Sequence, residues 1–160
     1  MIIDRKMRLF AALTLASLAV FAEKPPATIE GRVVAVHDGD TITVLQGTTQ
    51  YKIRLDGIDA PELSQAYGKV SKAFASDFAF GKTALVKVSG KDRYGRFLGE
   101  VFVDGSSLNR EIVRAGLAWH YKQYSKDGSL AALEAEAHML GKGLWKDAKP
   151  VPPWEYRKKK

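Results

Sequence analysis

Two short segments of the sequence carry acidic side chains where a strand pattern is interrupted. Asp38 and Asp40 flank a glycine in VVAVHDGDTITV, a run of β-branched and apolar residues that otherwise favours a strand. Asp59 and Glu62 follow a later run of the same kind, in IRLDGIDAPE. Because like charges repel and resist burial, such acids mark either an exposed turn or a place for a cation.

The order of the strand-like runs indicates whether these acids can meet. The runs span 29–36, 41–45 and 50–55, and the turn segments HDGD and QGTT separate them. QGTT joins the second and third runs as a hairpin, so the end of the third run returns to the start of the second, beside Asp40. We therefore expect three or four carboxylates to converge at one end of a sheet. Oxygen ligands without histidine suit a hard cation, Ca²⁺ first and Mg²⁺ or Mn²⁺ next.

The alternative interpretation of each motif is structural. DGD alone is a common turn, and DAPE (59–62) alone is a turn entering a helix, where acidic residues favour the helix dipole. An EF-hand loop is not expected, since Thr49 stands at the position of its closing glutamate. Only the expected convergence of the two segments favours a metal site over two ordinary turns.

Two arginines could complete such a site. Arg54 lies inside an apolar strand pattern, where a charged side chain must face solvent or a polar site, and Arg96 follows the glycine of DRYGR (92–96). Surface ion pairs would explain either arginine alone. Guanidinium groups also match phosphate oxygens two by two and keep their charge, which indicates a phosphate clamp. A cation, two arginines and a spare carboxylate together predict a site that cleaves phosphodiesters.

Composition excludes several other chemistries. The 160 residues include no cysteine, which rules out a disulfide framework, a thiolate zinc site and a cysteine nucleophile. His37, His120 and His138 are too widely spaced for an H-x-x-x-H pair, so a histidine metal site is not expected. The net charge of +7 suits an anionic polymer as partner, although the closing RKKK (157–160) supplies four of the positive charges.

The segment 1–22 has the pattern of a secretory signal peptide. Basic residues precede an uncharged run at 9–22, which is shorter than the roughly 20 residues that span a bilayer and ends on small residues. An uncleaved amphipathic or membrane anchor is the alternative. We expect a secreted or periplasmic protein without membrane attachment after signal removal. The mature chain would keep 22 basic and 17 acidic side chains, a net charge of +5.

The remaining chain divides into a lead-in at 23–28, a folded domain at 29–147 and a Pro-rich basic tail at 148–160. The tail either docks on the domain through Trp154 or stays loose. Five short strands without a parallel-crossover pattern predict an α+β fold, a five-stranded oligonucleotide-binding barrel with three helices. The fourth and fifth strand-like runs are 83–90 and 97–105, and the helical patterns are 67–80, 106–116 and 129–141.

The ordered set DGDT (38–41), RLDGIDAPE (54–62), DRYGR (92–96) and GLAW (116–119) resembles that of the staphylococcal nuclease family, the thermonucleases. The likeness covers nearly the whole mature chain. It implies the same barrel with three helices and Ca²⁺-dependent hydrolysis of DNA and RNA that leaves 3′-phosphates. Aromatic stacking and the barrel groove would hold single-stranded or frayed nucleic acid with little sequence preference, and we expect a monomer.

The resemblance assigns roles to the matching residues. The carboxylates of Asp40 and Asp59 and the backbone carbonyl of Ala60 would be the direct calcium ligands. Asp38 would act on the metal through water, and Thr41 would support the site.

Other matching residues would act on the substrate. Glu62 would be the general base for the attacking water, while Arg54 and Arg96 would hold the scissile phosphate. The nucleotide would be flanked by Tyr94 with Arg93 beside it, and its base would face Tyr121 or Tyr124.

One loop departs from the family pattern. Well-known members have a longer, lysine-rich loop before the first helix, whereas this chain has the short LSQAYGK (63–69). Fewer loop cations would weaken substrate binding or alter its preference. Two other functions stay open, a non-catalytic nucleic-acid-binding module on the same barrel and an envelope structural protein. Retention of all the candidate polar residues favours the enzyme.

Overall fold

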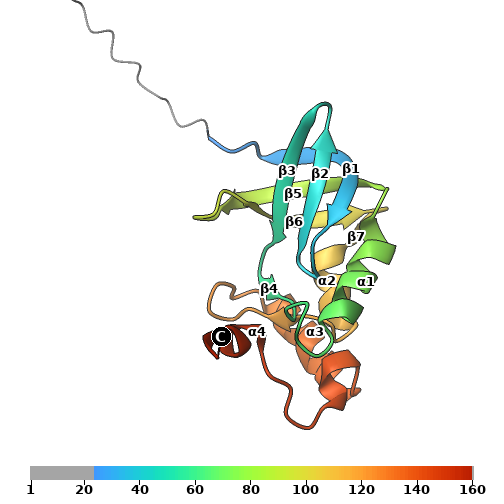
Figure 1. The fold of residues 1–160 in the computed structure, drawn as a ribbon, viewed down its shortest axis with the longest axis vertical. Coiled ribbons are helices and arrows are strands. Elements are labelled where there is room, and N and C mark those ends of the chain that lie inside the picture. The colour runs from blue at the N-terminus through green and yellow to red at the C-terminus, as the bar shows by residue number, and fades with distance from the viewer. Residues whose placement is uncertain (1–23, 160) are drawn as a thin grey trace, which may run out of the picture.

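Five strands close into a barrel whose ends meet through one parallel pairing. They lie in the order β3-β2-β1-β5-β6, and β3 pairs in turn with β6, from Ile53 opposite Phe97 to Leu55 opposite Gly99. Figure 1 shows this arrangement in the computed structural model, which describes residues 24–159. The strands are β1 Thr28–Val36, β2 Thr41–Gln46, β3 Thr49–Leu55, β5 Thr83–Lys91 and β6 Phe97–Val103. The predicted oligonucleotide-binding barrel is confirmed, and the expected signal peptide at 1–22 lies outside the described residues.

Short strands and helices complete the described part of the chain. The short strands are β4 Ile58–Asp59, β7 Ser106–Ser107 and β8 Trp119–His120. The helices are α1 Gly68–Ala79, α2 Leu108–Arg114, α3 Gly128–Met139, the 3-10 helix η1 Gly143–Lys146 and α4 Pro153–Lys158. Between residues 24 and 159 no helix is long and apolar enough to cross a membrane.

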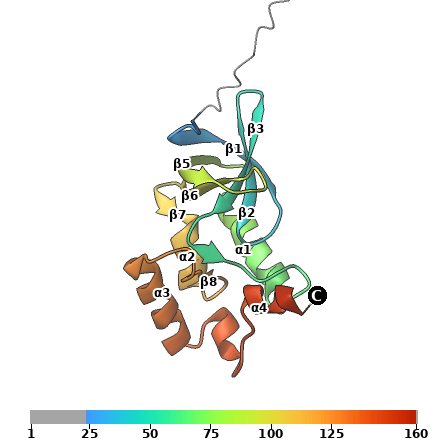
Figure 2. The same ribbon diagram turned by 90° about the vertical axis from the view of Figure 1, so that its left-hand side faces the viewer.

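The helix α4 was not predicted. It lies in the segment expected to be a Pro-rich tail, and it begins with Pro153, whose fixed φ suits the first position of a helix. Its six residues span fewer than two turns, too few for an apolar period to be visible in the sequence. Figure 2 shows α4 below the barrel, separated from α3 by β4 and β8.

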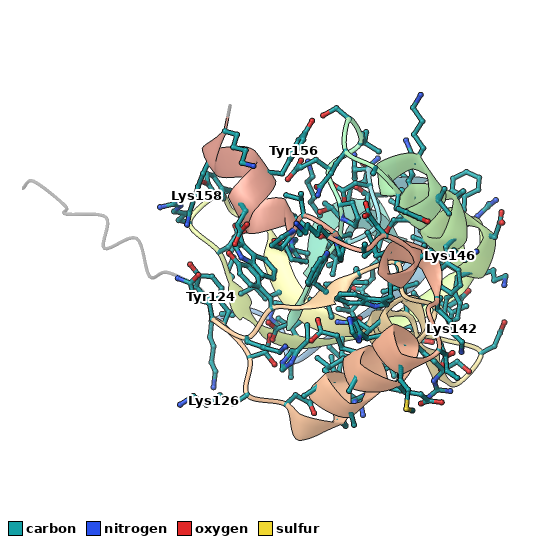
Figure 3. All side chains as sticks on the ribbon, turned by 90° about the horizontal axis from the view of Figure 1, so that it is seen from below. Tyr124, Lys126, Lys142, Lys146, Tyr156 and Lys158 are labelled. Atoms are coloured by element: carbon teal, nitrogen blue, oxygen red, sulfur yellow. The ribbon has the colours of Figure 1, made fainter. Side chains whose placement is uncertain are left out.

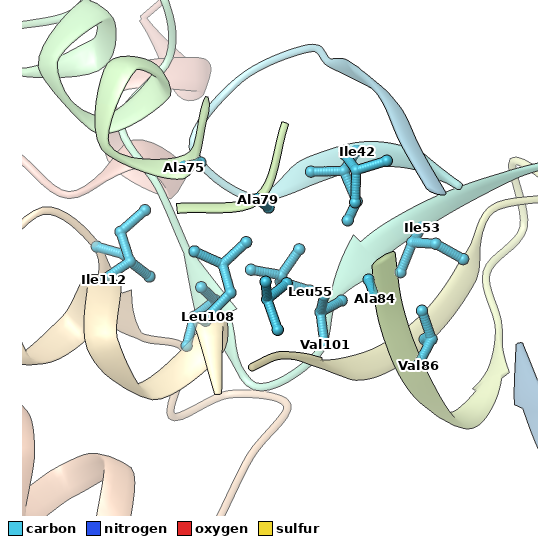
Figure 4. Packing of buried hydrophobic residues seen from close by; sticks show 14 of the residues in the cluster. Ile42, Ile53, Leu55, Ala75, Ala79, Ala84, Val86, Val101, Leu108 and Ile112 are labelled. Atoms are coloured by element: carbon cyan, nitrogen blue, oxygen red, sulfur yellow. The ribbon is translucent and has the colours of Figure 1, made fainter. Parts of the chain in front are cut away.

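Alternating apolar residues of the strands fill the barrel, and two helices close its lower end. Figure 4 shows the strand side chains pointing toward those of α1 and α2. The labelled members of this buried cluster are Ile42, Ile53, Leu55, Ala75, Ala79, Ala84, Val86, Val101, Leu108 and Ile112. Burying this apolar surface is the main stabilising contribution to the barrel.

The strand register decides which polar residues meet at the lower end of the barrel. β2 pairs with β3 so that Thr41 lies opposite Arg54, as the QGTT hairpin predicts. β4 pairs with β8, which places Asp59 opposite Trp119. The start of β2, the end of β3 and the whole of β4 therefore lie together.

A buried asparagine fixes the turn between β3 and β4. Asn109 of α2 is 2% exposed, and its Nδ2 donates to the backbone carbonyls of Asp56 (3.0 Å) and Gly99 (3.1 Å). Its Oδ1 accepts from the backbone N–H of Val101 at 3.0 Å. One side chain thus ties α2 to β6 and to the turn that leads to Asp59.

We expect Asn109→Ala to lower the free energy of unfolding by about 2–4 kcal/mol, because it leaves buried backbone groups without partners. Urea unfolding followed by circular dichroism measures the change. Gln123→Ala, at an exposed position, serves as the control and should change stability by less than about 0.5 kcal/mol. Equal midpoints for Asn109→Ala and the wild type would show that the asparagine does not hold this turn.

Candidate active site

The loop between β1 and β2 is pressed against the rest of the site by its glycine. A side-chain carbon at Gly39 would lie 1.9 Å from Ser71 Oγ and 2.8 Å from Ala60 Cβ, so no other residue fits there without displacement. The loop is also closed internally, since Asp38 Oδ1 accepts from the backbone N–H of Asp40 at 3.0 Å. The glycine of DGD is therefore required by close packing.

Asp40 is buried and joined to the segment that follows β4. Its carboxylate accepts from the backbone N–H of Ala60 at 2.6 Å and from Thr41 Oγ1 at 3.1 Å. Asp40 is 5% exposed, Ala60 4% and Thr41 2%. The two acidic segments of the sequence are thus in direct contact.

Arg54 links the two acids across the site. Its Nε lies 3.3 Å from Asp40 Oδ1, and its Nη2 donates to Asp59 Oδ1 at 2.9 Å. Its Nη1 donates to the backbone carbonyls of Leu55 (2.7 Å) and Ile58 (2.8 Å). All three guanidinium nitrogens therefore contact oxygen atoms of the site.

Burial and mutual repulsion oppose the ionised forms of two of these acids. Burial raises the pKa of Asp59, and the charge of Asp40 adds to the rise. Burial, followed by the charge of Asp40, also raises the pKa of Asp38 to about 6. A further positive charge at this position would stabilise the ionised carboxylates.

The donor chemistry fits a hard cation. Among residues 24–159 no group of three or more His, Cys, Asp or Glu side chains has the arrangement of a metal site. The predicted ligands are fewer, two carboxylates and the Ala60 carbonyl, and all are oxygen atoms. Carboxylate and carbonyl oxygens are the ligands that Ca²⁺ prefers.

The turn between β5 and β6 presents the basic and aromatic residues of DRYGR. Asp92 Oδ1 accepts from the backbone N–H groups of Tyr94 (2.9 Å) and Arg96 (3.0 Å), and Asp92 Oδ2 accepts from Arg96 Nε at 2.7 Å. Arg93 donates to the hydroxyl of Tyr94 at 2.8 Å, and both Arg93 and Arg96 lie over the Tyr94 ring. Asp92 therefore orients Arg96, and the Tyr94 ring contacts both arginines.

One cleft of about 670 Å³ joins these elements. It is lined by nearly every predicted site residue, namely Asp38, Asp40, Arg54, Asp59, Ala60, Glu62, Arg93, Tyr94, Arg96 and Tyr124. Among the predicted site residues, Thr41 does not line it and lies behind Asp40. The structure thus brings together residues from β3, β4 and four connecting segments.

Glu62 lies at the rim of this cleft. Its backbone N–H donates to Gln65 Oε1 at 3.2 Å, and its carbonyl accepts from the backbone N–H of Gln65 at 2.8 Å. The first residue of α1, Gly68, packs so closely on this turn that a side-chain carbon there would lie 1.9 Å from the Glu62 carbonyl oxygen. The short loop before α1 therefore holds Glu62 in place.

An arginine that the sequence analysis did not single out reaches the same acids. Arg157 of α4 donates to Asp59 Oδ2 at 2.7 Å, to Asp59 Oδ1 at 3.3 Å and to Glu62 Oε1 at 2.9 Å. The only sequence signal was the combination of aromatic and basic residues in WEYRKKK (154–160). The contact joins positions 98 residues apart, which no local pattern reveals.

Aromatic residues form the lower wall of the site. The ring of Trp154 stacks on Tyr121, with centroids 5.2 Å apart and planes 5° from parallel, and it also contacts the edge of Trp119. Tyr121 contacts Tyr124, which is 69% exposed. Of the two alternatives for the tail, docking through Trp154 is the one observed.

The chain is similar to a known protein family and to several bacterial proteins. Residues 52–147 match the family described as "Staphylococcal nuclease homologue". A protein from Escherichia coli named "Uncharacterized endonuclease" is 49% identical over 135 residues, covering 84% of this chain and 88% of the relative. A Haemophilus influenzae protein of the same name is 40% identical over 157 residues, covering 98% and 87%.

A more distant relative comes from a plant. The rice (Oryza sativa subsp. japonica) protein "Probable staphylococcal-like nuclease CAN1" is 41% identical over 111 residues, covering 69% of this chain and 34% of the plant protein. The family match, the closed barrel and the coverage of nearly the whole bacterial relatives all indicate the same family. The chain belongs to the staphylococcal nuclease family.

Proposed function

We propose that this chain is an exported, Ca²⁺-dependent nuclease, active as a monomer on DNA and RNA, that leaves 3′-phosphates. Its membership of a nuclease family supports hydrolysis of nucleic acid in general. The observation that carries the finer proposal is the meeting of Asp40 and Asp59, from separate segments, in a cleft that also contains Glu62 and Arg96. Export rests on the signal-like pattern of residues 1–22.

The site would bind the metal with one set of residues and activate water with another. Asp40, Asp59 and the Ala60 carbonyl would hold Ca²⁺, which when bound neutralises phosphate charge and polarises a phosphoryl oxygen. The Glu62 side chain is 37% exposed, so water reaches it, and it would take the proton of the attacking water. General-base catalysis of this kind contributes about 10²–10⁴ in rate.

Arg96 and Arg54 would stabilise the charge that builds on the phosphoryl oxygens. Asp92 holds Arg96 in position through its Nε, and the guanidinium lines the cleft. A positioned donor of this kind contributes most where charge develops in the transition state. Arg54 already contacts both metal-site acids and two carbonyls, which leaves one N–H of its Nη2 to bind a phosphate.

The substrate surface is aromatic. Tyr94 and Tyr124 are each 69% exposed at the cleft, where bases of a single strand can stack on them. Every base has an aromatic face, so stacking of this kind carries little sequence preference. The geometry therefore favours single-stranded or frayed DNA and RNA.

The first test is cleavage of labelled DNA and RNA with Ca²⁺ and with excess chelator. We expect both substrates to be cut with Ca²⁺, cleavage to stop in chelator, and the products to carry 3′-phosphates. Full activity in chelator would refute the metal dependence. No cleavage under any metal condition, with oligonucleotide binding intact, would indicate the alternative function, a non-catalytic binding module.

Substitution of the base and of the phosphate-binding arginine tests their roles. We expect Glu62→Gln and Arg96→Ala each to lower turnover by about 10²–10³, because one removes proton transfer and the other a charge-stabilising donor. Both variants should unfold at the wild-type urea concentration. Glu136→Gln, an exposed change of the same kind on α3, is the control. Near-normal rates in both variants would refute this assignment.

Arg54 should be distinguishable from Arg96 by its effect on stability. We expect Arg54→Met to lower the free energy of unfolding by about 3 kcal/mol, because Asp40 and Asp59 lose their shared guanidinium while they stay buried. Urea unfolding in the absence of metal measures this loss, with Arg96→Ala as the comparison. A stability equal to that of the wild type would mean that Arg54 does not compensate the buried acids.

A further inference from the structure

The C-terminal helix α4 covers the candidate active site. Figure 1 shows α4 beside β4 at the lower end of the barrel. Figure 3 shows Tyr156 and Lys158 on this helix, with Tyr124 on the neighbouring loop. The helix therefore lies against the elements that supply the acids and the aromatic wall.

Arg157 takes the position that a cation would need. It donates to both carboxylate oxygens of Asp59 and also to Glu62, with its shortest contact, Nη2 to Asp59 Oδ2, at 2.7 Å. Burial disfavours the charged guanidinium, but the bonds to Asp59 and Glu62 outweigh it and raise the pKa of Arg157. The same arginine thus neutralises an expected metal ligand and pairs with the expected general base.

Both acids are closed to solvent, and Arg157 is one of the groups that cover Asp59. Asp59 is 1% exposed and Asp40 5%, whereas the side chain of Arg157 that lies over Asp59 is 41% exposed. A hydrated cation cannot reach Asp59 unless a covering group moves. Of the two arginines paired with Asp59, Arg157 is the more exposed, at 41% against 12% for Arg54.

Trp154 stacks on Tyr121, one of the tyrosines that line the cleft. Its ring lies parallel to Tyr121 at a centroid distance of 5.2 Å, the arrangement that a stacked base would adopt. Tyr121 lines the cleft together with Asp59 and Arg157. One short helix therefore presents a cation to the acids and an aromatic ring to the tyrosine wall.

The attachment of α4 suits reversible release. A helix of six residues is not stable by itself in water, so its docking is what keeps it folded. Hydrogen bonds also tie the C-terminal segment to the short loop before α1, where Tyr156 meets Ser64 at 3.0 Å and Gln65 donates to the carbonyl of Val151. The segment 147–152, with two prolines, joins α4 to η1 and keeps the released helix close by.

We propose that α4 is an autoinhibitory latch in which Arg157 takes the place of the divalent cation and Trp154 that of a nucleobase. Divalent cation and single-stranded nucleic acid displace the helix, and the helix closes the cleft when they leave. This inference rests on the proposed function, since that function names the two occupants that α4 excludes.

The test compares the wild type, Arg157→Ala and Lys158→Ala, all without residues 1–22. Lys158→Ala removes the same charge from an adjacent, exposed position of the same helix. Calorimetric titration measures Ca²⁺ affinity, and fluorescence anisotropy in EDTA measures binding of a labelled oligothymidylate. Hydrogen exchange of the amides at 151–159 reports release of the helix.

We expect Arg157→Ala to bind Ca²⁺ roughly three- to tenfold tighter than the wild type, the range for losing a partly exposed competing ion pair. It should also bind the oligonucleotide more tightly, although it has lost a positive charge, which by itself would weaken binding. Lys158→Ala should show neither gain. In the wild type, Ca²⁺ or oligonucleotide should speed exchange at 151–159.

Failure of the latch and failure of the nuclease give different results. The latch is overturned if Arg157→Ala binds both ligands no more tightly than the wild type and neither ligand changes hydrogen exchange at 151–159. Cleavage that still depends on Ca²⁺ would leave the proposed nuclease function in place. If no form binds Ca²⁺, but Arg157→Ala binds the oligonucleotide more tightly and the oligonucleotide speeds exchange at 151–159, the latch holds and the calcium dependence is refuted.

Discussion

A single guanidinium group, that of Arg54, holds together two buried acids that would otherwise repel. Asp40 comes from the loop after β1 and Asp59 from β4, and Arg54 reaches both while it also caps two backbone carbonyls. Leaving one such charge buried without its partner costs about 3–5 kcal/mol. The cleft has its acidic centre only because the barrel register places Arg54 opposite Thr41, directly beside Asp40.

A second positive charge would further stabilise the two ionised acids, and there are two candidate sources of it. Arg157 supplies the charge from within the molecule, and Ca²⁺ would supply it from outside. Arg157 is bonded to both carboxylate oxygens of Asp59, so under the proposed latch the two cations compete for them. Since Arg157 is 41% exposed and Asp59 keeps its pairing with Arg54, release of Arg157 leaves neither charge buried without a partner, so the cleft is not closed permanently.

Much of the barrel and of the cleft could be predicted because the relevant contacts follow from local hairpins. The QGTT turn sets the pairing of Thr41 with Arg54, and alternating apolar residues identify the strands. The same pairing predicts that DGD and DAPE meet, although it does not reveal that Arg54 bridges them. The chemical roles of these residues remain predictions.

The rest could not be predicted, for identifiable physical reasons. The helix α4 is too short to show an apolar period, and the contact of Arg157 with Asp59 joins segments 98 residues apart. The pairing of β4 with β8 involves two residues on each side, which carry no strand signal of their own. The close packing of Gly39 on Ser71 depends on where α1 crosses the barrel, which sequence spacing does not specify.

A crystal structure of the protein in Ca²⁺, with anomalous diffraction to locate the ion, tests the central claim most directly. The account predicts one calcium peak about 2.3–2.6 Å from carboxylate oxygens of both Asp40 and Asp59, with Arg157 withdrawn from Asp59. A calcium ion bound elsewhere, or none at saturating Ca²⁺ while Arg157 still pairs with Asp59, would contradict it.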